Sequence, residues 1–134
     1  MAVKQMTTQE IIRDCDETRS NNRDWKELYK NLHAAIESGK YRIMRSNNTL
    51  FLYKLVDKGS AQMFVFNADT PKNFLRNMKE FFKAMQKAGF HTIFGVTENP
   101  QILKMLDRTG YAVDVEDAGI DEKNRPLFKG IVHV

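Results

Sequence analysis

The stretch TIFGVTENPQILKMLDRTGYAV, residues 92–113, decides the fold of this chain. It begins with an apolar run of residues that favour β-strands, and a short turn follows. Apolar residues then recur at helical spacing up to Gly110, after which a second run favours a strand. Glycine commonly ends a helix because it adopts positive φ without steric cost. The stretch therefore predicts a strand over 91–97, an amphipathic helix over 99–109 and another strand over 111–116, followed by an acidic loop over 117–125 and a last strand over 126–134.

The segment before it, TPKNFLRNMKEFFKAMQKAG at 70–89, predicts the longest helix. Thr70 is a good N-cap, Pro71 suits the first helical position and Gly89 is a stop signal. Its apolar stripe consists of Phe74, Leu75, Met78, Phe81, Phe82 and Met85. Upstream, the runs TLFLYKLV and SAQMFVFN are joined by DKG, a tight-turn signal, and Tyr41–Arg45 supplies a further strand before an SNN turn. The middle of the chain therefore predicts an antiparallel meander followed by a helix.

The first third predicts two helices, over about 8–19 and 25–39, separated by SNNRDW at 20–25. The element order is thus α-α-β-β-β-α-β-α-β-β. Because strands joined through a helix run parallel with right-handed crossovers, 60–96 predicts a parallel pair inside a mostly antiparallel sheet. We expect a single domain, 1–134, of α+β (mixed α/β) class, with helices on both faces of the sheet.

Composition limits the classes of protein that this chain can be. It has 134 residues, a formal net charge of +4, and one cysteine, Cys15. No window approaches the roughly 18 apolar residues of a membrane span, and the first residues do not resemble a signal peptide. We therefore expect an intracellular, cytoplasmic protein without disulfides and without a membrane role. The basic charge permits nucleic acid, a phosphate-bearing cofactor or an acidic protein as partner, and requires none of them.

The element order resembles that of the GNAT acyl-CoA N-acyltransferase superfamily. The best residue match lies within 60–113, where the family follows its fifth strand with Asn, then with small or apolar residues, and closes the helix with Gly and an aromatic. Here Asn99, Ile102, Leu103, Met105, Gly110 and Tyr111 stand at that spacing. The resemblance implies that acetyl-CoA or another acyl-CoA lies in a cleft between two parallel strands that splay apart.

The resemblance also assigns site residues. The pantetheine arm would be held by the backbone groups of Phe64, Val65, Phe66 and Asn67. The pyrophosphate would meet Thr70, Lys72 and Asn73, and Asn99 would close the far side of the cleft. Direct attack of an amine on the thioester would be the reaction. Glu98, at the end of a parallel strand, is a candidate general base, or alternatively a carboxylate that stabilises the following helix.

The sequence departs from the family at two places. The glycine-rich pyrophosphate loop falls at 69–74, where the chain reads DTPKNF without glycine; Pro71 lacks an N–H, and Asp69 brings a negative charge. Many members carry a tyrosine as general acid in the next helix, at the position of Leu106 here. Tyr111, five residues on, is the nearest substitute. These departures leave two hypotheses open: an N-acyltransferase with an unknown acceptor amine, or a non-catalytic binding or structural protein with the same fold.

Small GNAT-like proteins with altered loops occur in short-tailed lytic bacteriophages, and this chain looks similar to them in size and in its strand–Asn–helix–Gly ending. A phage-encoded protein would act in the host cytoplasm or in the virion, for example as a virion component or as an inhibitor of a host protein. A protein partner and a small amine are therefore both candidate ligands.

Other charged and titratable residues have a plain and a functional interpretation. Five cations form a stripe on the longest predicted helix, and the stripe is either its solvated back or a ridge that follows phosphates or an acidic partner: Lys72, Arg76, Lys79, Lys83 and Lys87. Nucleic acid is a possible but less favoured partner. The acidic residues Asp114, Glu116, Asp117, Asp121 and Glu122 form either a solvated loop or a surface that attracts a cation or a second copy. His33, His91 and His133 have no second ligand at metal spacing, and Cys15 has acidic neighbours that disfavour a nucleophile.

Overall fold

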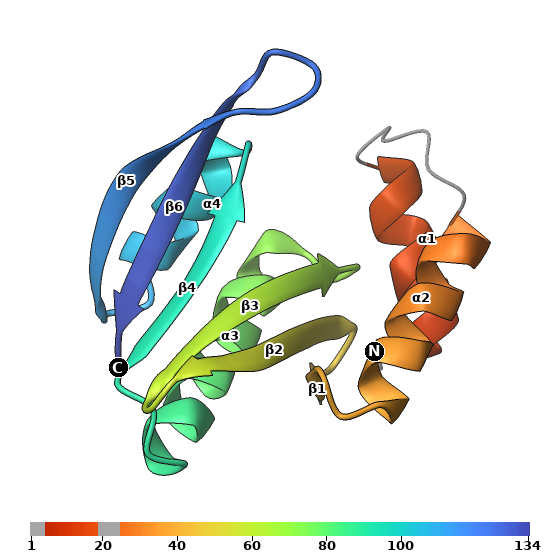
Figure 1. The fold of residues 1–134 in the computed structure, drawn as a ribbon, viewed down its shortest axis with the longest axis horizontal. Helices are drawn as coiled ribbons and strands as arrows, with labels where there is room; N and C mark the ends of the chain where they lie inside the picture. The colour runs from red at the N-terminus through yellow and green to blue at the C-terminus, as the bar shows by residue number, and fades with distance from the viewer. Residues whose placement is uncertain (1–4, 19–24) are drawn as a thin grey trace.

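The computed structural model describes residues 5–18 and 25–134, so the helix break expected at 20–24 lies outside the described residues. The helices are α1 (Thr8–Thr18), α2 (Trp25–Glu37), α3 (Pro71–Lys87) and α4 (Pro100–Asp107). The strands are β1 (Arg42–Ser46), β2 (Thr49–Asp57), β3 (Ser60–Asn67), β4 (Thr92–Thr97), β5 (Ala112–Ile120) and β6 (Pro126–His133). The described elements follow the predicted order, and the mixed α+β fold class is confirmed (Figure 1).

The strands form a six-stranded sheet in the order β1-β2-β3-β4-β6-β5. β1, β2 and β3 are antiparallel neighbours, as are β4, β6 and β5. The two halves meet at β3 and β4, which run parallel because α3 connects them. This junction is the parallel unit that the sequence predicted over 60–96.

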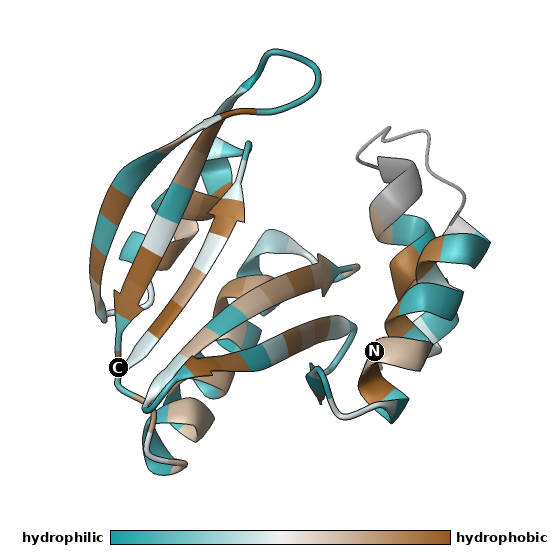
Figure 2. Cartoon of the chain, in the orientation of Figure 1, coloured by the Kyte–Doolittle hydropathy of each residue, from teal (hydrophilic) through white to brown (hydrophobic). Residues whose placement is uncertain are grey.

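Helices cover the two faces of the sheet differently. α3 and α4 pack on one face, where the stacked rings of Phe51 and Phe81 lie 4.3 Å apart at the centre of the larger core. α1 and α2 lie on the other face, where Ile11 and Ile12 pack against Leu50 and the neighbouring strands. Alternation along β2 produces both cores, since Leu50 and Leu52 point to one face and Phe51 to the other. Figure 2 shows apolar residues concentrated along the strands, with a hydrophilic turn between β5 and β6.

The caps of α3 are those predicted from sequence. Thr70 is the N-cap, Pro71 occupies the first turn, and Gly89 follows the helix at a φ of 98°. Asn77 was not foreseen as part of the buried face; it is 0% exposed although it is polar. Cys15, on α1, is 4% exposed and packs in the core between that helix and the sheet.

The acidic segment 117–125 corrects one prediction. It was expected to be a loop, whereas β5 continues to Ile120 and pairs with β6 as far as Pro126. A register shift between Asp117 and Ile120, with Gly119 at a φ of 91°, absorbs the irregularity. Pairing with β6 therefore outweighs the low strand propensity of the acidic residues.

No helix in the described part of the chain is long and apolar enough to cross a membrane.

Candidate functional site

β3 and β4 separate soon after they begin. Their parallel pairing covers only Ser60–Gln62 against Thr92–Phe94. Beyond it, β3 stays paired with β2 as far as Asn67, and β4 stays paired with β6 as far as Thr97. Because each strand follows its own antiparallel partner, the sheet opens between them, as Figure 1 shows.

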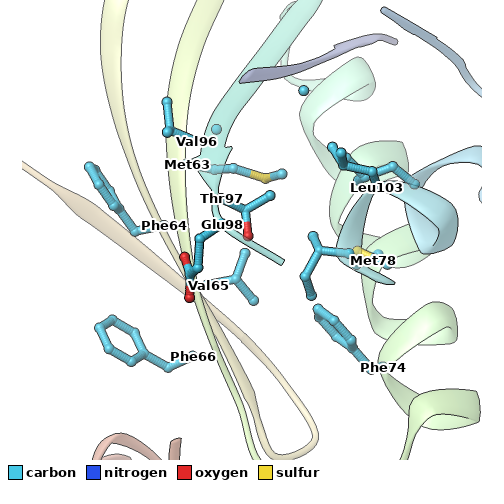
Figure 3. Close-up of a pocket in the computed structure, with 14 residues that line it drawn as sticks. Met63, Phe64, Val65, Phe66, Phe74, Met78, Val96, Thr97, Glu98 and Leu103 are labelled. Carbon is cyan, nitrogen blue, oxygen red and sulfur yellow. The ribbon is translucent and has the colours of Figure 1, made fainter. Parts of the chain in front are cut away.

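A cavity of about 200 Å³ fills this opening. Its walls come from β3 and β4, from Phe74 and Met78 on α3, and from Ile102, Leu103 and Leu106 on α4 (Figure 3). The walls are mainly apolar, and the polar side chains among the described lining residues are those of Thr97 and Glu98. A cavity of this kind suits a chain-like ligand with an apolar reacting end.

The backbone of β3 faces the opening at alternate residues. A Cβ placed on Gly95 would lie 3.2 Å from the carbonyl oxygen of Met63, so that carbonyl points toward β4. The N–H and C=O groups of Val65, two residues on, point the same way. Those of Phe64 and Phe66 point toward β2 instead. Val65 therefore offers backbone groups without a strand partner inside the cavity.

The N-terminus of α3 was expected to meet a pyrophosphate. Thr70 and Asn73 are bonded to each other there, because the Asn73 amide donates to Thr70 Oγ1 at 3.3 Å. The Phe74 amide donates to the Thr70 carbonyl at 2.8 Å. Since Pro71 has no N–H, the Lys72 amide is the donor that the first turn presents outward, next to an exposed Lys72 side chain.

The carboxylate of Asp69 points into the protein. Its Oδ2 atom accepts hydrogen bonds from the amide of Asn48 (2.9 Å), from the hydroxyl of Thr49 (3.2 Å) and from Nδ2 of Asn77 (2.7 Å). The side chain of Asn67 joins this network, because its Oδ1 accepts from Thr49 and from the Asp69 amide. We call these five residues the Asp69 network. The network fixes the loop before α3 where the family has glycines.

Glu98 and Asn99 mark the end of β4. Asn99 is the N-cap of α4 and accepts from the Gln101 amide at 3.0 Å, while its own amide donates to Thr97 Oγ1 at 3.0 Å. Glu98 is half-buried and lines the cavity, and Figure 3 shows its carboxylate reaching toward Val65. Among the described residues this carboxylate has no ion pair or hydrogen bond, so it is available to a ligand.

The position of the family tyrosine is apolar. Leu106 is 2% exposed and lines the cavity beside Gly130. Tyr111, the nearest substitute, lies elsewhere: its ring packs edge-on against Phe82 at 5.8 Å, within the core under α3. Glu98 is thus the ionisable side chain among the described residues that line the cavity.

Four of the predicted site residues line the cavity: Phe64, Val65, Phe66 and Glu98. The others do not line it: Asn67, Thr70, Lys72, Asn73, Asn99 and Tyr111.

Sequence reasoning did not foresee that Asn77 and Thr49 belong to the Asp69 network. Asn77 follows the spacing of the buried α3 stripe, and a polar residue at such a position was the available signal. The three histidines are dispersed: His33 pairs with Glu37, His133 with Asp114, and the ring of His91 lies beside Gly59. The five cations of the α3 stripe are all exposed.

Comparison with solved structures returns GNAT acetyltransferases. A ribosomal-protein-alanine N-acetyltransferase from Brucella melitensis matches with a TM-score of 0.64 and 10% identity, over 100% of both chains. A chimeric spermidine N-acetyltransferase from Vibrio cholerae has a TM-score of 0.68 and 10% identity, over 97% of this chain and 93% of its own. A phosphinothricin acetyltransferase from Sinorhizobium meliloti, solved with acetyl-CoA, has a TM-score of 0.61 and 10% identity, over 96% and 84%.

No protein-family model matches this chain, and no curated protein matches its sequence significantly. The similarity to solved structures extends over nearly the whole chain, but the sequence identity is very low, so what is shared is the fold. The chain therefore has the GNAT fold.

Proposed function

We propose that this protein is an N-acyltransferase that binds acetyl-CoA or a related acyl-CoA between β3 and β4. The observation that supports this most strongly is the cavity at the splayed parallel pair, with the backbone groups of Val65 exposed inside it. A pantetheine arm is an extended chain with amide groups, so it can pair with such a strand edge as an added strand does. The residues present fit this part of the ligand.

The phosphate end of the ligand would meet the start of α3. The helix dipole and the Lys72 amide favour an anion there, and the Lys72 side chain adds a full positive charge. The carboxylate of Asp69 does not face an anion bound there, because it accepts hydrogen bonds from Thr49 and Asn77 inside the protein. Fewer backbone donors are available than a glycine-rich loop supplies, so we expect binding weaker than is typical of the fold.

Transfer would proceed by direct attack. The nitrogen of a neutral amine attacks the thioester carbonyl carbon, so that a C–N bond forms and the C–S bond breaks. Glu98 accepts the proton that the amine nitrogen loses, and the departing thiolate is protonated by water because Leu106 offers no acidic hydrogen. Holding the amine against the thioester supplies most of the acceleration. The acceptor would be a small amine or an amine on a partner protein.

Calorimetric titration with acetyl-CoA tests the proposal, using Val65→Pro against Val65→Ala. Proline removes the amide that faces the cavity, and no hydrogen bond to β2 is lost with it. We expect Val65→Pro to weaken acetyl-CoA binding about tenfold, the size of one well-made hydrogen bond, and Val65→Ala to change it little. Equal affinities for the two variants would rule out the proposed position of the pantetheine arm.

A non-catalytic binding or structural role is the second candidate. The observation that favours it is the closed start of α3, where Thr70 and Asn73 bond to each other and proline replaces a donor. In that case acetyl-CoA would not bind, and the cavity would serve a protein partner or remain a packing defect. Titration of the unaltered protein separates the two candidates: heat that saturates with acetyl-CoA supports the enzyme, and its absence at millimolar ligand supports the binding protein.

A further inference from the structure

One face of the sheet is covered by helices over only part of its width. α1 and α2 pack against Leu50 and Leu52 on β2 and against Phe66 near the end of β3. Figure 1 shows both helices beside that half of the sheet, away from β4, β6 and β5. Four apolar residues on the rest of this face belong to neither core, and we call them the open face: Phe64, Phe94, Val96 and Ile131.

Alternation along the strands places these four side chains on the same side of the sheet. A Cβ on Gly130 would lie 3.0 Å from Leu106, so Gly130 and its partner Gly95 face α4. The residues next to these glycines on β4 and β6 therefore point away from α4. Phe64 points the same way, because both of its neighbours on β3 pack in the core under α3. It is 41% exposed, and Val96 is 49% exposed.

The open face continues into the proposed acyl-CoA cavity. Phe64 and Val96 belong to the lining of that cavity, and so does Glu98, two residues beyond Val96 on β4. Figure 3 shows Phe64 on one side of the strands and Met78 of α3 on the other. Because α3 and α4 close that other side, an amine that attacks a thioester held between β3 and β4 approaches over the open face. The unreactive part of the amine would then contact Phe64 and Val96.

Cations surround the open face. The ammonium group of Lys129 lies 4.6 Å from the centre of the Phe94 ring. Those of Lys40 and Lys54 each lie 5.8 Å from the centre of the Tyr41 ring, which packs edge-on against the open face at 5.7 Å. None of the three lysines makes an ion pair with a described residue. Their potential repels a substrate that carries several ammonium groups.

The other carboxylates on this side of the sheet lie farther from the cleft. Asp114 and Glu116 are on β5, which β6 separates from β4. Asp114 is paired with His133 at 2.8 Å, and Glu116 stands opposite Lys129 in the strand register. Among the described residues, Glu98 is therefore the carboxylate at the cleft itself, where it can meet a single amine.

We propose that the acceptor is a small primary amine that carries an aromatic ring, and not a polyamine. This inference rests on the proposed acyl transfer and names its substrate class. The ring would pack on the exposed side chains of Phe64 and Val96, and the amine nitrogen would lie between Glu98 and the thioester carbonyl carbon. The C–N bond then forms as the C–S bond breaks, and the proton of the amine passes to Glu98. A polyamine would instead place its remaining ammonium groups near the three lysines.

Calorimetric titration of phenethylamine into the protein saturated with CoA tests the inference, because CoA without an acyl group permits binding but no reaction. Ethylamine is the probe that lacks the ring, and spermidine is the probe that adds ammonium groups. We expect phenethylamine to bind at least about tenfold more tightly than ethylamine, since burying a ring contributes at least that much. Spermidine should bind more weakly than phenethylamine and should gain affinity as salt screens the lysines.

Val96→Ser and Val115→Ser form a matched pair of variants. The two valines are 49% and 51% exposed, and both lie on strands. Val115 stands opposite Gly130, so it faces the side of α4 and not the open face. We expect phenethylamine to bind about fivefold more weakly to Val96→Ser, the effect of losing contact with one or two methyl groups, and with unchanged affinity to Val115→Ser. Matching circular dichroism spectra establish that both variants fold.

The possible outcomes separate this inference from the proposed function. CoA binding followed by no binding of phenethylamine would overturn the inference and leave acyl transfer standing, whereas absence of CoA binding would overturn both. Equal affinity for ethylamine, tighter binding of spermidine, or equal losses in the two valine variants would also overturn the inference. A dimer in sedimentation that dissociates in Val96→Ser would show that a second copy covers the open face, which is again the contrary result.

Discussion

Replacing Asp69 by alanine removes one acceptor from three donors at once. Oδ2 of Asp69 accepts from the amide of Asn48, the hydroxyl of Thr49 and the side-chain amide of Asn77. These three residues are 4%, 0% and 0% exposed, so water cannot freely replace the carboxylate. The Thr49 hydroxyl keeps Asn67 Oδ1 as an acceptor at 2.9 Å, so the amide of Asn48 and one N–H of the Asn77 side chain are the donors that lose their acceptor. Leaving a buried donor unpaired costs about 1–3 kcal/mol. Because Asp69 is itself half-buried, some water will enter, and we expect a total loss of about 3 kcal/mol.

Urea unfolding followed by circular dichroism measures this loss. For a domain of this length about 3 kcal/mol corresponds to a fall of roughly 10 °C in the thermal midpoint. Asp69→Asn is the matched control, since it keeps one oxygen acceptor in nearly the same volume and should cost less than half as much. A loss below about 1 kcal/mol for Asp69→Ala would refute the claim that the Asp69 network, in place of glycines, holds the start of α3.

Three further predictions concern separate parts of the molecule. Glu98→Gln should lower the rate of acyl transfer to an amine about a hundredfold or more, as loss of a general base does, while urea unfolding stays unchanged; an unaltered rate would remove Glu98 from the mechanism. Phe81→Ala should cost about 3–5 kcal/mol in urea unfolding because the ring is fully buried and stacked on Phe51, and a cost near 1 kcal/mol would contradict that packing. Hydrogen bonding from the Arg125 amide lowers the pKa of Asp121 below the ordinary 3.8; the stability that Asp121 contributes is therefore present above pH 3.8 and is lost as the pH falls through its own lower pKa, which an NMR titration of the carboxyl group checks.

Local signals predicted the elements around the site well. Thr70, Pro71 and Gly89 bracket α3 because capping is decided by the residues at the helix ends. The spacing from Asn99 to Gly110 located α4 for the same reason. The parallel pairing of β3 and β4 followed from the element order, since the two strands are joined through a helix. That they separate and leave an opening was implied only by the resemblance to the family.

Contacts between distant segments could not be predicted in this way. Asp69 was interpreted as a charge opposing an anion at the helix start, yet its donors come from Asn48 and Thr49, about twenty residues earlier, and from Asn77 on the far side of the loop. Tyr111 was proposed for its closeness in sequence to Leu106, but its ring packs against Phe82. In both cases the side chain points toward residues that are distant in sequence and close in the fold.

The strand β5 shows the same limit at the level of an element. Its acidic residues have low strand propensity, and the sequence therefore indicated a loop from Asp117 onward. Pairing with β6 extends the strand to Ile120, and Gly119 permits the register shift that the extension needs. Strand propensity is a property of context, and the context here is a partner strand that the local sequence does not reveal.

The central claim is that acyl-CoA binds between β3 and β4, and thermal unfolding with and without acetyl-CoA tests it most directly. At a ligand concentration about a hundred times the dissociation constant, binding adds about 2.7 kcal/mol to the free energy of unfolding, which raises the midpoint of a domain of this size by roughly 10 °C. The account predicts this rise in the unaltered protein and a smaller one in Val65→Pro. An unchanged midpoint at millimolar acetyl-CoA would contradict it and leave the non-catalytic role as the function to pursue.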